Sequence, residues 1–320
     1  MLEGADIVQW DAELSLPCPV RVPLERAWQE LREQDLLPDV RLLLEGHANK
    51  GEKAERNLAL ATPTDIPWLF MTPGVGWLYG KESRERLMDS GAFRDTSGWP
   101  WGEGHLASLR DPAGHVSVVA ANLTVLVVDD TIAHDRRRLE SWEDLLDPSW
   151  EKSVAFRGNG RTFCETTLLT LESRFGEDRM SGFRRSVGGS GHPAQMVKAL
   201  SRPGPDTLPA ATLPLFFARL IPRREGLRIV WPREGAIASP VTLFTRRGSP
   251  PGVNALAQWL HGPEVAEIFS SVGLPSCRPG ADWNVPEGRE LLWIGWDAIR
   301  EGDLGPRLQR LQELFDGAGT

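Results

Sequence analysis

The stretch Arg157-Gly158-Asn159-Gly160-Arg161-Thr162 combines residue types that suit the binding of an anion. Two glycines let backbone N–H groups approach a ligand closely, and two arginines can hold a carboxylate or oxyanion through paired hydrogen bonds. Thr162 is of the type that caps helices, and we expect it to cap the helix that follows. No Gly-Lys-Ser/Thr follows, which argues against a nucleotide-phosphate loop. A strand-to-helix turn with surface arginines is an equally good interpretation.

A second constellation could hold a metal ion. Cys18, Cys164 and His192 fall in predicted loops, and thiolate with imidazole suits zinc, nickel or copper. A bound metal ion or metal chelate is therefore one hypothesis for a cofactor. The alternative is structural, because free cysteines are commonly buried and a lone histidine is commonly structural. Cys277 is most simply a packing residue.

The sequence contains no CxxC or HExxH motif, no recognisable Ser/His/Asp or Cys/His arrangement and no carboxylate pair at diagnostic spacing. We therefore predict a binding protein and not an enzyme. The alternative is a cytoplasmic enzyme or sensor that uses Cys18 or Cys164 as a nucleophile.

Strands and helices alternate around these residues. Apolar runs predict strands at 7–14, 40–44, 66–71, 116–129 and around Val154, with a tight turn at 16–19. Helical spacing of apolar residues predicts helices through 24–31, 81–90 and 304–315. This alternation predicts an α/β fold with mostly parallel sheets that helices cover on both faces.

In open α/β sheets, ligands bind beyond the carboxyl ends of the strands. The predicted loops at 15–18, 72–76, 157–164, 188–192 and 210–212 are therefore candidate ligand contacts. Glu234 could meet a cationic group or be a solvated turn acid, and Trp99, Trp101 and Trp231 could stack on a ligand or pack under loops. The candidate ligand-binding residues are Ser15, Cys18, Thr72, Gly74, Arg157, Asn159, Arg161, Thr162, Cys164, His192, Thr212 and Glu234.

Three segments carry a resemblance to a known family. They are Ser141-Trp142-Glu143-Asp144-Leu145-Leu146-Asp147-Pro148-Ser149-Trp150 with the strand after it, Ile229-Val230-Trp231-Pro232-Arg233-Glu234-Gly235-Ala236 with Ser239-Pro240, and the two predicted helices within 254–274. In order and spacing these segments resemble ABC-transporter periplasmic substrate-binding proteins of the iron(III)-type branch. The resemblance covers most of the chain after about residue 65.

This resemblance implies a class II, two-lobed periplasmic-binding-protein-like fold, in which each lobe is a mixed sheet flanked by helices and a cleft lies between the lobes. Lobe one would comprise residues 1–124 and 236–320, and lobe two residues 125–235. The C-terminal helix would pack on lobe one. The implied function is capture of a small ligand (an anion, a metal chelate or a metal ion) by hinge closure, in service of an ABC permease.

The resemblance does not extend to the ferric site. Iron(III) binders of this family use two adjacent tyrosines near the return crossing, often with a His and a Glu. The chain has one tyrosine, Tyr79, and the stretch where we expect the pair reads Ala210-Ala211-Thr212-Leu213. Because Fe(III) prefers phenolate and carboxylate oxygens, binding of free ferric ion is in doubt.

Net charge, the length of apolar stretches and the first residues of the chain bear on its partners and its location. The net charge of −8 argues against a nucleic-acid partner. No apolar stretch reaches the ~18–20 residues that cross a bilayer, so we expect no membrane insertion. The first residues lack the basic region of a signal peptide. We expect a periplasmic or envelope location if a signal was trimmed, a cytoplasmic one if Met1 is the native start, and a monomer in either case.

Overall fold

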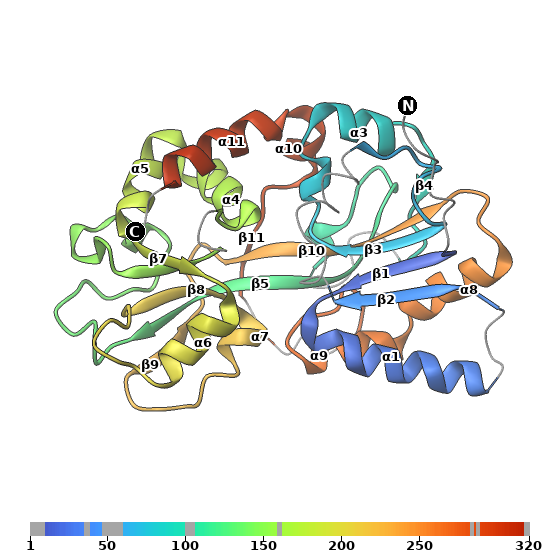
Figure 1. Cartoon of the computed structure of the whole chain (residues 1–320). Coiled ribbons are helices and arrows are strands. Elements are labelled where there is room, and N and C mark those ends of the chain that lie inside the picture. Colours follow the sequence, from blue (N-terminus) through green and yellow to red (C-terminus); the bar gives the residue numbers. More distant parts are fainter. Residues whose placement is uncertain are drawn as a thin grey trace, which may run out of the picture. The chain divides into compact units, whose positions relative to one another are not determined.

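The computed structural model describes residues 10–34, 39–46, 60–99, 106–158, 162–281, 285 and 289–316. The chain forms two compact units (Figure 1). Unit 1 comprises Met1–Ala121, Ser239–Asn284 and Gly295–Leu304, and unit 2 comprises Asn122–Ala238, Val285–Ile294 and Gly305–Thr320. The chain first passes from unit 1 to unit 2 within strand β5 (Ser117–Asp129) and returns within β10 (Ala236–Arg246). The sequence predicted these two crossings at 124/125 and 235/236.

In unit 1, three parallel strands lie side by side in the order β2 (Leu42–Gly46), β1 (Ala12–Leu16) and β3 (Leu69–Pro73) (Figure 1). The second half of β10 pairs antiparallel with β3, and β4 (Phe93–Arg94) pairs with β10. The helices of this unit are α1 (Cys18–Glu33), α3 (Lys81–Leu87), α8 (Pro251–Leu260), α9 (Pro263–Ser271) and α10 (Trp296–Glu301), with 3-10 turns η2 (Gly76–Leu78) and η3 (Ala107–Leu109).

Helix α1 shows why local sequence specifies these elements. Leu24, Ala27 and Trp28 of the predicted apolar face are buried, together with Val20, whereas Leu31 of that face is half-buried. The predicted tight turn at 16–19 is wrong in its second half, because α1 already begins at Cys18. Proline in the first turn of a helix costs little, since the N–H that it lacks would have no partner within the helix.

In unit 2, β7 (Val187–Gly191), β6 (Val154–Arg157) and β8 (Ala210–Pro214) are parallel neighbours. The second half of β5 pairs antiparallel with β8 and with β9 (Leu227–Val230), and β11 (Leu291–Leu292) runs parallel to the start of β10. The helices are α4 (Glu165–Phe175), α5 (Glu177–Ser186), α6 (Pro193–Ser201) and α7 (Leu215–Ala218), with turns η4 (Glu143–Leu146) and η5 (Pro148–Trp150).

Two stretches that the sequence predicted as loops are strands. Residues 188–191 belong to β7 and 210–212 to β8. Glycine-rich sequence favours a loop locally, but β7 pairs with β6, and at Gly188 the backbone that leads into β6 comes so close that only glycine fits. A Cβ added to Gly188 would lie 2.3 Å from the carbonyl oxygen of Lys152.

The C-terminal helix α11 (Leu304–Phe315) has the predicted bounds but a different location. From Gly305 onward it belongs to unit 2, not to the first lobe as the sequence suggested. Arg307 pairs with the buried carboxylate of Glu172, and the Phe315 ring lies 5.4 Å from that of Phe163. The Gln312 side chain accepts a hydrogen bond from the Phe163 N–H and donates one to the Phe163 carbonyl. These contacts hold the helix on unit 2.

Within the described residues, none of the helices is both long enough and apolar enough to cross a bilayer.

Candidate functional site

In unit 2, the carboxyl ends of three parallel strands meet at one edge of the sheet, and a helix follows each strand there. Strand β6 leads to α4, β7 to α6 and β8 to α7. Helix N-termini present free N–H groups and the positive end of the helix dipole. This edge is therefore suited to an anionic group of a ligand.

Arg157 lies at the end of β6 and is held by its backbone. Its N–H donates to Thr212 Oγ1 at 3.0 Å, and its carbonyl accepts from the N–H of Cys164 at 3.0 Å. The next residue must be glycine, because a Cβ on Gly158 would lie 2.4 Å from the carbonyl oxygen of Thr162. The Arg157 side chain is half-buried, and its backbone is fixed at the end of β6 by these contacts. Asn159 and Arg161, the other proposed members of the anion clamp, lie outside the described residues.

Thr162 does not cap the following helix, contrary to the sequence prediction. Helix α4 begins at Glu165, and Cys164, not Thr162, occupies the N-cap position, with no capping hydrogen bond from its side chain in the described part of the chain. The bridge between Gly158 and Phe163 closes the turn first and displaces the helix start beyond Thr162.

His192 caps α6 with its own ring. Its Nδ1 accepts from the N–H of Ala194 at 3.2 Å, so the neutral ring carries its proton on Nε2. The ring meets that of Phe217 edge-on, with centroids 6.0 Å apart. His192 and the start of α7 are therefore neighbours, whereas Thr212 is fully buried in β8 with its hydroxyl oxygen accepting from Arg157 N–H.

Sequence reasoning missed Phe217. The signal was available as an adjacent aromatic pair, Phe216-Phe217, whose ring centroids lie 4.5 Å apart at the start of α7. Residues 210–213, where the family resemblance led us to look for a tyrosine pair, belong to the buried strand β8. Phenylalanine has no hydroxyl oxygen to offer a ferric ion.

Unit 1 has a comparable edge at the carboxyl ends of β1, β2 and β3. Ser15 is fully buried near the end of β1, and Glu45 of β2 lies beside it in register. Glu45, a carboxylate near the end of a parallel strand, was not among the predicted site residues. Cys18 begins α1 with an exposed, free thiol.

Thr72 and Gly74 position the backbone at the end of β3. The Thr72 side chain is buried and its carbonyl accepts from Thr242 Oγ1 at 3.1 Å. Gly74 adopts φ 86°, a left-handed conformation that favours glycine, while its N–H donates to the Pro240 carbonyl at 2.7 Å. Both residues support the turn, and Thr72 offers no exposed side chain.

The proposed Cys/His metal set stays a prediction. No group of three or more His, Cys, Asp or Glu side chains within the described ranges is arranged to hold a metal ion. Cys18 belongs to unit 1, whereas Cys164 and His192 belong to unit 2. Cys277 is buried, and burial raises the pKa of its thiol far above the usual value.

Glu234 has a structural role. It accepts hydrogen bonds from the Ser141 hydroxyl at 2.5 Å, from Trp142 N–H at 3.1 Å and from Glu143 N–H at 3.2 Å. Partial burial by itself raises the pKa of Glu234, but these hydrogen bonds lower it by more. The pKa of Glu234 therefore lies below its usual value. The carboxylate thus holds the start of η4, where Ser141 also accepts from Glu143 N–H.

Two of the three tryptophans that the sequence singled out, Trp99 and Trp231, contact residues of their own units. Trp231 donates from Nε1 to the Glu290 carbonyl at 2.9 Å, and the Trp99 ring meets His261 edge-on at 5.1 Å. Trp101 lies outside the described residues. For Trp99 and Trp231, packing accounts for the observed contacts.

Comparison with known proteins assigns the chain to a family. The sequence model of the bacterial extracellular solute-binding proteins matches residues 64–302. No curated protein sequence matches significantly. Similar solved structures include Trichodesmium FutA (IdiA) in complex with iron and citrate ligands, at 17% identity, TM-score 0.63 and coverage of 96% of this chain and 98% of that one.

Two further structures agree in fold. The apo ferric ion-binding protein A of Pasteurella haemolytica is 11% identical, with TM-score 0.67 over 96% of this chain and 98% of that one. Apo FutA2 of Synechocystis is 14% identical, with TM-score 0.66 over 95% and 96%. These comparisons confirm the predicted two-lobed α/β fold and give no support to the enzyme or sensor alternative. With three quarters of its length matched, the chain belongs to the bacterial extracellular solute-binding protein family.

Proposed function

We propose that this solute-binding protein captures a small anionic solute, either a carboxylate or a metal chelate that presents carboxylates, and delivers it to an ABC-type permease in the cell envelope. The observation that carries the proposal is the carboxyl edge of the unit 2 sheet. Arg157 lies there together with the N-termini of α4 and α6.

The electrostatics of this edge favour an anion over a cation. A guanidinium can grip a carboxylate through two parallel hydrogen bonds. Cys164, the N-cap residue of α4, makes no side-chain capping hydrogen bond within the described residues, and the N–H groups and dipole of a helix N-terminus favour an anion. His192 adds an Nε2–H donor, and Phe217 adds an apolar surface beside it.

A chelated metal fits this chain better than a free ferric ion. The single tyrosine, Tyr79, is buried in unit 1, and the adjacent aromatic pair of unit 2 consists of phenylalanines. The Trichodesmium neighbour is in complex with iron and citrate ligands. By analogy, citrate could supply the oxygens that this chain does not supply and present free carboxylate to Arg157.

Capture would follow from closure of the two units on the ligand. Each unit carries polar side chains at the carboxyl edge of its own parallel strands: Glu45 in unit 1, and Arg157 in unit 2 with His192 at the start of α6. A ligand that binds both edges stabilises the closed form and shifts the population toward it. We expect the protein to act as a monomer.

Binding of citrate and of ferric citrate tests the proposal. Titration would follow the intrinsic tryptophan fluorescence and be repeated by calorimetry. Arg157→Gln should weaken binding by about tenfold or more, as expected for the loss of a charge-assisted hydrogen bond. The matched control is Arg223→Gln, an exposed arginine of the same unit. Equal affinity of Arg157→Gln and Arg223→Gln for every probe would contradict the proposal.

A further inference from the structure

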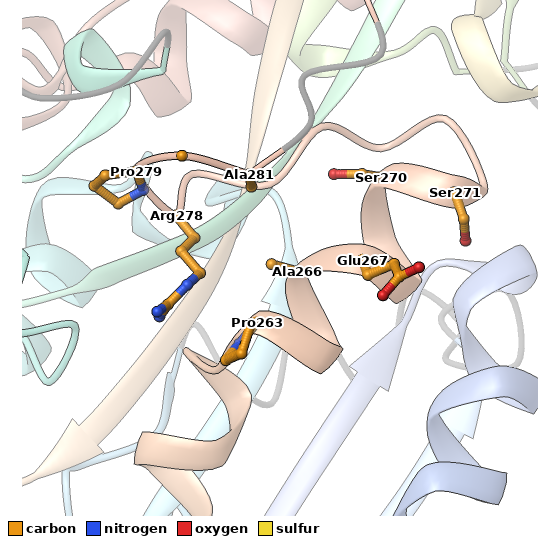
Figure 2. Close-up of a pocket in the computed structure, with 9 residues that line it drawn as sticks. Pro263, Ala266, Glu267, Ser270, Ser271, Arg278, Pro279 and Ala281 are labelled. Carbon is orange, nitrogen blue, oxygen red and sulfur yellow. The ribbon is translucent and has the colours of Figure 1, made fainter.

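A cavity of about 590 Å³ lies in unit 1, and none of its lining residues belongs to the candidate site described above. One wall is helix α9 and the other is the turn that begins at Arg278 (Figure 2). Its volume falls within the range of small-molecule sites, about 300–1,000 Å³.

The wall formed by α9 is one face of the helix. Its lining residues follow helical spacing: Pro263, Ala266, Glu267, Ser270 and Ser271. Val265 and Phe269 are buried in the core instead. The short side chains of Ala266 and Ser270 leave the space that the cavity occupies, and they give it a surface that is partly apolar and partly hydroxyl.

The opposite wall presents one cation, Arg278. Its Nη1 donates to the His261 carbonyl at 2.7 Å, which fixes the orientation of the guanidinium. The Arg278 N–H donates to Ser276 Oγ, and the Arg278 carbonyl accepts a hydrogen bond from the Ala281 N–H. These two bonds hold the main chain at Arg278 as well. Arg278 forms no ion pair with any carboxylate of the described residues. A half-buried, oriented arginine is thus available to an external anion.

Glu267 provides the opposite charge. It lines the same cavity from α9, is exposed, and has no hydrogen bond or ion pair within the described part of the chain. Figure 2 shows Glu267 on the helix wall and Arg278 on the turn wall, with Ala266 and Pro263 between them. The cavity therefore offers a cation, an anion and an apolar surface between the two.

We propose that this cavity binds a small zwitterion, an amino acid or similar compound, whose carboxylate pairs with Arg278 and whose amine pairs with Glu267. Prolines and alanines contact its aliphatic part. This second site does not depend on the solute-binding site proposed above, since the two share no residue.

Three probes of matched size test the proposal: 4-aminobutyrate, butyrate and butylamine. Binding to the full chain would be followed by NMR chemical shifts of unit 1 amides. We expect 4-aminobutyrate to bind about tenfold more tightly than either probe that carries one charge. Arg278→Gln should weaken both carboxylates by about tenfold, and Glu267→Gln should weaken both amines, 4-aminobutyrate and butylamine, while leaving butyrate unchanged.

The control variants are Arg223→Gln and Glu225→Gln, exposed residues of unit 2 that should change nothing. Glu267 is exposed, so Glu267→Gln remains informative even if Arg278→Gln disturbs the fold. Absence of saturable shifts, equal binding of 4-aminobutyrate and butyrate, or indifference to Glu267→Gln would each overturn the proposal. Citrate binding is measured separately, so its failure would be distinguishable.

Discussion

His261 should make unit 1 sensitive to acid, and His261→Gln should remove that sensitivity. The ring is 3% exposed, and its Nε2 lies 3.2 Å from Thr96 Oγ1 while Nδ1 has no partner among the described residues. Burial lowers its pKa from 6.5 to about 4. The carboxylate of Asp95 opposes this shift, and the guanidiniums of Arg278 and Arg110 reinforce it.

The magnitude follows from the two pKa values. Between pH 6.5 and about 4 the unfolded chain binds a proton at this residue and the folded chain does not, so unfolding is favoured as the pH falls. The contribution of neutral His261 is fully present above pH 6.5 and lost by about pH 4. At about 1.4 kcal/mol per pKa unit, the loss amounts to about 3 kcal/mol.

Urea unfolding of wild type and His261→Gln between pH 7 and 4 measures this loss. The variant has a constant offset from the altered contact with Thr96, so the quantity compared is the change in unfolding free energy with pH. Carboxylates titrate in both proteins, so their contribution cancels when the pH dependence of the variant is subtracted from that of the wild type. His134→Gln, at an exposed position, serves as the control. Hydrogen exchange identifies which transition belongs to unit 1.

Two results would refute this reasoning. One is a parallel pH dependence of wild type and His261→Gln over the whole range. The other is an NMR titration in which the His261 ring takes up its proton near pH 6.5, since that would show that burial does not disfavour the charged ring.

Two further predictions concern unit 2. Gly158→Ala should lower the free energy of unfolding by about 1–3 kcal/mol, because its Cβ would meet the Thr162 carbonyl. Gly204 has open space around it, so Gly204→Ala should leave the free energy of unfolding unchanged. Thermal unfolding of the two variants checks this. Glu234→Gln should cost about 1–3 kcal/mol at pH 7 through weaker bonds to Ser141 and the η4 backbone. Because the folded pKa of Glu234 is lowered, this cost should fade as the pH drops below about 4.5, and a cost that persists in acid would contradict the assigned role.

Sequence patterns predicted the elements whose signal is local and periodic. The apolar run at 116–129 became the buried strand β5. The stripe of leucines in α11 predicted its bounds to the residue. Family segments around Ser141 and Trp231 predicted the fold, because their order and spacing survive where overall identity does not.

The site could be predicted only in part. The rule that ligands bind at the carboxyl ends of parallel strands selected Arg157 and His192, and the structure has them at the end of β6 and the start of α6, at one edge of the unit 2 sheet. It also selected Thr72 and Thr212, whose side chains are buried, because sequence position does not reveal which way a side chain points. Phe217 and Glu45 were missed for a different reason, since their nearness to His192 and Ser15 depends on the packing of helices and strands that are distant in the chain.

By itself, the sequence determined the family, the α/β alternation and the doubt about free ferric ion, because residue type and short-range periodicity carry that information. Only the tertiary structure decided that α11 belongs to unit 2, that glycine-rich 188–191 is a strand and that Glu234 caps η4. Each of these depends on contacts between residues far apart in the chain. Such contacts override local propensity because buried pairs and backbone ladders contribute more free energy than any single residue's preference.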